Sequence, residues 1–281
     1  MGLWARIREN GVLYIGILVL VYMLAPIAVI AVFSFNDPTG KFNFEWVGFT
    51  TDYWKGAFDN EEINQSLLLS IRLAFFTAVG STFLGTLIAL ALVRYQFLGR
   101  KAANLLIVIP IATPEVVIGA ALLSMFLLYG INLGFTTLLI AHIMFSISFA
   151  VIVVRSRLIG FDRRLEEASA DLGASPITTF FKITLPLLLP GIAGALMLTF
   201  ALSVDDFVIS NFNAGSNVTF PLYIFGANQR GIPVQVNVIA TMMFTVAVVA
   251  MLVVIFQQRR AERMVERRAD DDNKATVSIP I

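Results

Sequence analysis

Six apolar stretches, each about as long as a lipid bilayer is thick, constrain this chain more than any other feature. They fall at about 11–33, 67–93, 103–128, 135–154, 187–209 and 235–257. A membrane-spanning helix needs about 20 consecutive, mostly apolar residues. The composition agrees, because 58% of the residues are hydrophobic and 14% are charged, against about 25% charged in an ordinary soluble domain. The sequence therefore predicts an all-α, polytopic membrane protein with six transmembrane helices.

These stretches divide the chain into segments. We expect a short N-terminus at 1–10, a first transmembrane helix at 11–33, an external loop at 34–66 and a core of five helices at 67–257, followed by a tail at 258–281. The first helix is expected to be retained, because it is longer than a signal-peptide core and no small-residue cleavage site follows it.

The lysines and arginines predict the orientation of the helices. Sixteen of the 20 basic residues lie in 6–8, 94–101, 155–182 and 259–274, which are all on one side of a six-span topology. Basic residues accumulate in cytoplasmic loops. Both termini are therefore predicted to be cytoplasmic. The opposite loops are weakly acidic, which favours a cationic solute unless topology alone has depleted them of bases.

Three carboxylates fall inside predicted spans: Glu115, Asp205 and Asp206. A charged residue at the centre of a membrane helix costs about 2.5–3.5 kcal/mol on insertion scales, and it normally faces the bundle interior or a water-filled path. Such residues are functional candidates by default. We expect them to lie on a path for solute.

Helical spacing separates the two adjacent aspartates, because neighbours on a helix point about 100° apart. Asp206 continues a polar row that includes Ser203 and Ser210, and this row is predicted to line the path. Asp205 lies on an otherwise apolar row. It is expected to pair with a neighbouring helix, for which Arg72 is one candidate, or to cap a helix break. A second row of small residues is predicted to be a packing seam rather than a pore lining: Ser70, Ala74, Thr77, Ser81 and Gly85.

Glu115 follows Pro110 and Pro114. Prolines in a span free backbone carbonyls, which must then be satisfied by protein or a cavity. The sequence therefore predicts an opened helix with a carboxylate beside carbonyl acceptors. The separated ammonium groups of a polyamine would suit such a site.

One loop, 155–186, is much longer than the other connections on its side. Asp162 and Ser175 are candidate N-caps, and Gly173 fits the left-handed position after a helix. We expect two short helices there. Their sequence contains Glu167, Ala168 and Ser169, then Gly173 after three residues, and Ile183-x-Leu185-Pro186 after nine more.

This spacing resembles the EAA loop of permease subunits in type I ABC importers, with Ser169 in place of the second alanine. The resemblance implies the MetI-like permease fold and a coupling helix that docks on an ATPase subunit. It also implies which residues lie at or near that contact: Glu167, Ala168, Ser169, Asp171, Leu172 and Gly173. Without such a partner, the same helix would be an amphipathic helix on the membrane surface.

The segments SVDDFVISNF and ATPEVVIGAALL resemble those of spermidine/putrescine permeases. This resemblance implies a bacterial inner-membrane subunit with several partners: a second homologous permease, two copies of an ATPase, an external solute-binding protein and membrane lipid. It gives no role to nucleic acid. ATP and magnesium would bind the ATPase, and no cofactor is expected on this chain.

The chain is not expected to be an enzyme. No G-x-x-x-x-G-K-[ST] nucleotide-binding motif occurs, there are no cysteines, and the single histidine, His142, lies in the middle of a span. We expect His142 to hydrogen-bond a neighbouring helix. Three alternatives remain open: a permease of the same ABC class for another cationic or small organic solute, a secondary transporter in which Asp206 and Glu115 titrate, and a membrane scaffold whose carboxylates pair internally.

Overall fold

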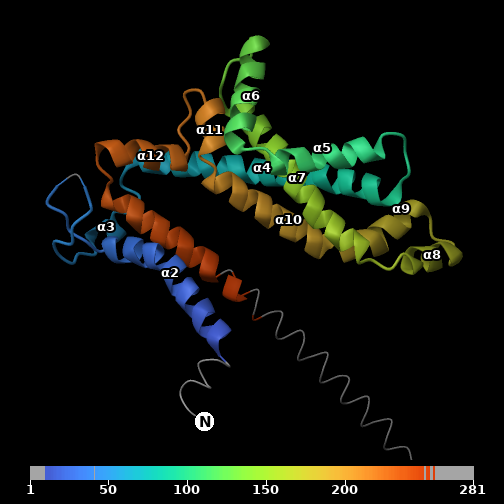
Figure 1. Ribbon diagram of the computed structural model, residues 1–281, viewed down its shortest axis with the longest axis horizontal. Coiled ribbons are helices and arrows are strands. Elements are labelled where there is room, and N and C mark those ends of the chain that lie inside the picture. The colour runs from blue at the N-terminus through green and yellow to red at the C-terminus, as the bar shows by residue number, and fades with distance from the viewer. Residues whose placement is uncertain (1–9, 41, 250, 254–255, 257–281) are drawn as a thin grey trace, which may run out of the picture. The chain divides into compact units, whose positions relative to one another are not determined.

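The computed structural model describes residues 10–40, 42–249, 251–253 and 256, and it is helical almost throughout (Figure 1). The predicted cytoplasmic tail at 258–281 and the first nine residues lie outside the described part. The chain forms two compact units, one from Met1–Asn60 with Arg230–Ile281 and the other from Glu61–Gln229.

The first unit contains two apolar helices. They are α2 (Gly11–Phe33) and the helix Val234–Val253. The short α3 (Asp52–Lys55) lies in the loop that follows α2 in the chain. A small core forms where Ala57 packs with Val234 and Val238. The loop after α2 is ordered by the buried Asn36, whose amide group donates to Asn43 Oδ1 and to the Glu45 carbonyl, both at 2.7 Å.

The second unit is the bundle that carries the predicted core. Its long helices are α4 (Glu61–Arg94), α7 (Phe135–Ile159) and α10 (Leu185–Asp205), and two shorter ones are α5 (Arg100–Ala112) and α6 (Glu115–Leu128). Between α7 and α10 come α8 (Arg164–Asp171), α9 (Pro176–Thr179) and the π-helical turn η1 (Phe180–Thr184). The unit closes with α11 (Val208–Asn213) and α12 (Phe220–Arg230).

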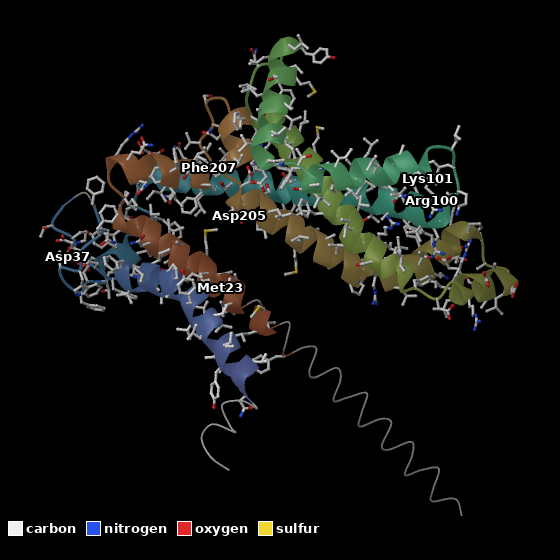
Figure 2. All side chains as sticks on the ribbon, in the orientation of Figure 1. Met23, Asp37, Arg100, Lys101, Asp205 and Phe207 are labelled. Atoms are coloured by element: carbon white, nitrogen blue, oxygen red, sulfur yellow. The ribbon has the colours of Figure 1, made fainter. Side chains whose placement is uncertain are left out.

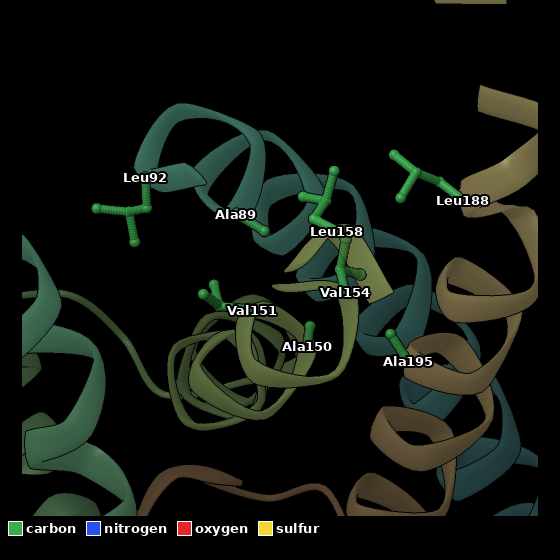
Figure 3. Packing of buried hydrophobic residues seen from close by; sticks show 8 residues of the cluster. All are labelled: Ala89, Leu92, Ala150, Val151, Val154, Leu158, Leu188 and Ala195. Atoms are coloured by element: carbon green, nitrogen blue, oxygen red, sulfur yellow. The ribbon is translucent and has the colours of Figure 1, made fainter. Parts of the chain in front are cut away.

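The bundle is built around α4, which packs against both α7 and α10. Small and branched side chains fill the junction and bring the helices close together (Figure 3): Ala89, Leu92, Ala150, Val151, Val154, Leu158, Leu188 and Ala195. The predicted small-residue seam is confirmed, since Ser70, Ala74, Thr77, Ser81 and Gly85 are all buried on α4. Small residues favour such seams because they let helix backbones approach.

Two predicted spans are corrected. The stretch 103–128 is not one helix, because α5 and α6 meet at Thr113 and Pro114 with a bend of 109°. The stretch 187–209 is also not continuous, because α10 ends at Asp205 and α11 begins at Val208. Five described helices are long and apolar enough to cross a membrane, or six if the bent pair counts as one span. Both breaks fall beside the intramembrane carboxylates.

Candidate functional site

The two helix breaks come together in the bundle, because α11 packs against α6. Asn213 on α11 donates to the Gly119 carbonyl on α6 at 3.3 Å. This contact places Glu115, the first residue of α6, near the end of α10. The three carboxylates therefore lie at two helix breaks whose helices pack together, and they are called the acidic cluster below.

Asp206 stabilises the break between α10 and α11. It is the residue that follows α10, and it is 8% exposed. Its Oδ2 accepts from the Ser210 backbone N–H at 2.9 Å and from the Ser210 hydroxyl at 3.1 Å, and its Oδ1 accepts from the Ile209 N–H at 3.3 Å. These amides are at the start of α11, where no earlier carbonyl satisfies them. Asp206 is thus the N-terminal cap of α11 in chemical terms.

His142 on α7 joins both sides of the break. Its Nδ1 lies 2.8 Å from Ser203 Oγ on α10, and its Nε2 lies 3.0 Å from Ser210 Oγ on α11 and 3.3 Å from Asp206 Oδ2. A neutral ring with its proton on Nε2 satisfies the whole network, because Nε2–H then faces the oxygens of Asp206 and Ser210 while Nδ1 accepts from Ser203. The prediction that His142 hydrogen-bonds a neighbouring helix is confirmed.

Asp205 and Glu115 differ from Asp206 in that their side chains are exposed. Asp205 is the last residue of α10, and Figure 2 shows it beside the α10–α11 junction near Phe207. No ion pair involving Asp205 or Glu115 occurs among the residues that the structure describes. The side chain of Arg72 lies over the Phe135 ring at 5.0 Å, so the suggested pairing of Asp205 with Arg72 is wrong.

Burial separates the two aspartates, because Asp206 is buried and Asp205 is exposed, and the path role predicted for Asp206 stays a prediction. The row through Ser203, Asp206 and Ser210 exists, but all three side chains are buried against His142 instead of lining an open surface. The predicted polar row requires one continuous helix through residue 209. Because the helix ends at Asp205, spacing along a continuous helix does not decide which carboxylate is accessible.

The long loop between α7 and α10 forms the two predicted short helices, α8 and α9. Ser175 Oγ accepts from the Thr178 N–H at 3.3 Å, as expected for an N-cap. Gly173 has a φ of +82°. Ala174 N–H donates to the Ser169 carbonyl at 3.1 Å and Gly173 N–H donates to the Ala170 carbonyl at 2.9 Å, which is the Schellman pattern for ending a helix.

Helix α8 has two different faces. Glu167, Ala168, Asp171, Leu172 and Gly173 are exposed, with Leu172 at 90%. Ser169 instead turns inward, where its hydroxyl lies 3.0 Å from Thr179 Oγ1 on α9. The small residue at this position therefore packs the two short helices together. Ser169 is 8% exposed, so it would support the predicted ATPase contact from below and not by direct exposure.

Sequence reasoning missed the residues that hold the inner face of α8. Glu166 Oε1 lies 2.7 Å from Arg94 Nη2, at the end of α4, and it also accepts from the Thr184 hydroxyl at 2.5 Å. One available signal was the three-residue spacing of Glu166 and Ser169, which puts both on one helix face. Nothing in the sequence pointed to Arg94 or Thr184 as partners.

The chain has clear relatives among known proteins. The family described as binding-protein-dependent transport system inner membrane component matches residues 81–269. The spermidine/putrescine transport system permease protein PotC of Haemophilus influenzae is 38% identical over 80% of this chain and 88% of its own. PotC of Escherichia coli K12 is 39% identical over 81% and 86%, and the putrescine transport system permease protein PotI of that strain is 32% identical over 79% and 81%.

Solved structures share the fold. A bacterial ABC transporter involved in the import of alginate has a TM-score of 0.63 at 19% identity, covering 93% of this chain and 98% of its own. An amino acid ABC transporter has a TM-score of 0.55 at 17% identity, covering 75% and 100%. The fold is that of ABC importer permeases, as the loop spacing predicted. By sequence and fold alike, this chain belongs to the family of binding-protein-dependent transport system inner membrane components, alongside the spermidine/putrescine permeases.

Proposed function

We propose that this chain is a membrane-spanning permease subunit of an ATP-driven importer of polyamines such as spermidine and putrescine. It forms the translocation path together with a second, homologous permease subunit. An external binding protein delivers the solute, and two ATPase subunits, which carry ATP and magnesium, act on the exposed face of α8. Both termini face the cytoplasm of a bacterial cell, and the chain lies in its plasma membrane.

The observation that carries the substrate class is the acidic cluster at the paired helix breaks. Asp205 and Glu115 are exposed and have no basic partner among the described residues. A carboxylate inside a membrane bundle is stable only beside water, a partner charge or a cationic solute. A linear polyamine carries separated ammonium groups, each with several N–H donors, and it can bind carboxylates of two helices together.

The backbone adds to the attraction for cations. The last carbonyls of α10 have no intrahelical donor, and the C-terminal end of a helix dipole carries partial negative charge. Asp205 is located at that end. Its charge and the carbonyl dipoles therefore act in the same direction, while the hydrogen bonds of Asp206 keep the break open beside them.

The path is predicted to be gated by the ATPases, since the chain itself has no nucleotide-binding motif. ATP-driven closure of the two ATPases would move the bundle through α8 as a nearly rigid body. In this cycle the residues of this chain bind and release the solute. They carry out no chemical step on it.

Uptake by the reconstituted complex tests this proposal. Vesicles containing both permeases and the ATPase, supplied with binding protein and ATP, should accumulate labelled putrescine or spermidine, and each should compete with the other. An amino acid should not compete. Uptake of a different cation that polyamines do not inhibit would support the second candidate, a permease for another cationic solute, and uptake without ATP would favour a secondary transporter.

A further inference from the structure

We infer that Arg94, Glu166 and Thr184 form a joint that makes α8 move together with α4 and α10, so that the joint transmits force between the ATPases and the bundle. This inference rests on the proposed function, because that function supplies the ATPases that act on α8. The contact among the three residues is present in the structure. The joint residues act by positioning α8 and are not expected to touch solute or nucleotide.

The joint connects three separate elements at one carboxylate. Arg94 is the last residue of α4, Glu166 lies on α8, and Thr184 ends η1 immediately before α10. The Arg94 guanidinium donates to Glu166 Oε1 at 2.7 Å, and the Thr184 hydroxyl donates to the same oxygen at 2.5 Å. Charge-assisted bonds of this kind are about twice as strong as neutral ones.

The joint is shielded from solvent, which raises its value over that of a surface ion pair. The side chains of Arg94 and Glu166 are 16% and 20% exposed, and Thr184 is 4% exposed. The Arg94 guanidinium also lies over the Phe161 ring at 5.3 Å. Phe161 is in the connection between α7 and α8, so Arg94 holds the loop at its start and again at Glu166. Exposed ion pairs contribute little to stability, whereas the Glu166 carboxylate accepts from two donors in a shielded position.

The position of the joint relative to the exposed face of α8 gives it a mechanical role. Glu166 and Glu167 are consecutive, and the helix turns one inward and the other outward. A force applied to the outer face reaches the bundle through whatever fixes the inner face. The Ser169–Thr179 contact fixes α8 only to the neighbouring α9. The Glu166 joint fixes it to α4, which is 34 residues long and about 50 Å in length.

The joint can be tested in the complete, reconstituted transporter by comparing variants that each remove a charge or a hydroxyl from it. Glu166→Gln and Arg94→Gln should leave recovery of the ATPase unchanged but raise the ATP hydrolysed per solute imported by about three- to tenfold, the range that one shielded charge-assisted contact supports. Thr184→Val should give a smaller increase. Asp162→Asn is the matched control, because it makes the same charge change in the same loop and Asn caps a helix equally well.

Two further results would distinguish a joint from a general structural role. The double variant Arg94→Gln with Glu166→Gln should have a smaller effect than the sum of the two single variants, because both single variants remove the same Arg94–Glu166 contact. Glu167→Gln should differ from Glu166→Gln by lowering ATPase recovery. An unchanged ATP-to-solute ratio in Glu166→Gln, or additive effects in the double variant, would overturn the inference.

Spin labels give a readout that does not depend on the solute. The chain contains no cysteine, so labels can be introduced at Tyr95→Cys and Arg163→Cys, which are exposed positions beside the joint. The distribution of distances between the two labels should stay constant through the ATP cycle in the otherwise unaltered complex. In Glu166→Gln this distribution should become broader. A constant distance in both would contradict the joint. If the complex imports no polyamine, the proposed function fails and the label distances still test the joint.

Discussion

His142 Nε2 on α7 lies 3.3 Å from Asp206 Oδ2 at the α10–α11 break, and both side chains are almost completely buried. Through Ser203 and Ser210 the same imidazole also contacts the helices on either side of that break. One histidine therefore fixes how α11 leaves α10, and so it fixes where the exposed Asp205 is located.

Replacing His142 should destabilise the protein and reduce transport together. His142→Ala removes the imidazole partner of the buried Ser203 hydroxyl and one of the donors to Asp206, and a buried polar group left unsatisfied costs about 1–3 kcal/mol. The thermal midpoint of the purified complex should fall clearly. His142→Gln, whose amide both donates and accepts, should recover part of the loss. A wild-type midpoint for His142→Ala would contradict the role of His142 as the link across the break.

Asp205 and Asp206 should respond differently to the same change. Asp205→Asn alters an exposed side chain that forms no ion pair with any residue that the structure describes, so the free energy of unfolding should change by no more than about 0.5 kcal/mol. Uptake should nevertheless fall about tenfold, because one charge-assisted contact to the cation is lost. Glu115→Gln should behave in the same way.

Asp206→Asn should mainly lower stability, by about 1–3 kcal/mol, because an NH₂ group would replace an oxygen that accepts from Ser210. Uptake and thermal unfolding measured on the same preparations check both expectations. Full stability with lost uptake in Asp206→Asn would instead support the sequence prediction that Asp206 lines the path.

Gly173 should be required for docking of the ATPase. Its φ of +82° is costly for a residue with a side chain, and apart from its two chain neighbours no described residue has a heavy atom within 4 Å of a Cβ placed there. Gly173→Leu and Gly173→Asn should therefore both lower ATPase recovery in a pull-down, because each adds a side chain on the exposed face. Asn tolerates the left-handed conformation. Normal recovery for Asn with reduced recovery for Leu would mean that backbone strain, and not close approach by a partner, explains this glycine.

Gly85 should be intolerant of even one added carbon. A Cβ at this position would lie 2.6 Å from Ala150 Cβ and 3.1 Å from the Val151 nitrogen, so Gly85→Ala forces α4 and α7 apart. Overpacking of this kind costs about 1–3 kcal/mol. Gly16→Ala on α2 is the control, because nothing lies within 4 Å of its added carbon. Equal thermal midpoints for the two variants would contradict the close α4–α7 seam.

The sequence by itself determined the features that depend on local composition and spacing. Apolar length predicted the spans, the small residues from Ser70 to Gly85 predicted the seam on α4, and the spacing from Glu167 to Pro186 predicted the family and the two loop helices. Gly173 and Ser175 end and begin those helices as expected, since caps are set by neighbouring residues. The prolines before Glu115 indicated a disrupted helix, and the structure has a sharp break there.

Only the tertiary structure decided which carboxylate is accessible and what holds α8. The roles of Asp205 and Asp206 depend on where α10 ends, and that end is stabilised by His142, more than 60 positions earlier in the chain. The joint likewise pairs Arg94 with Glu166 across 72 positions. Such contacts form when separate helices pack, and the period of one helix carries no information about a partner on another.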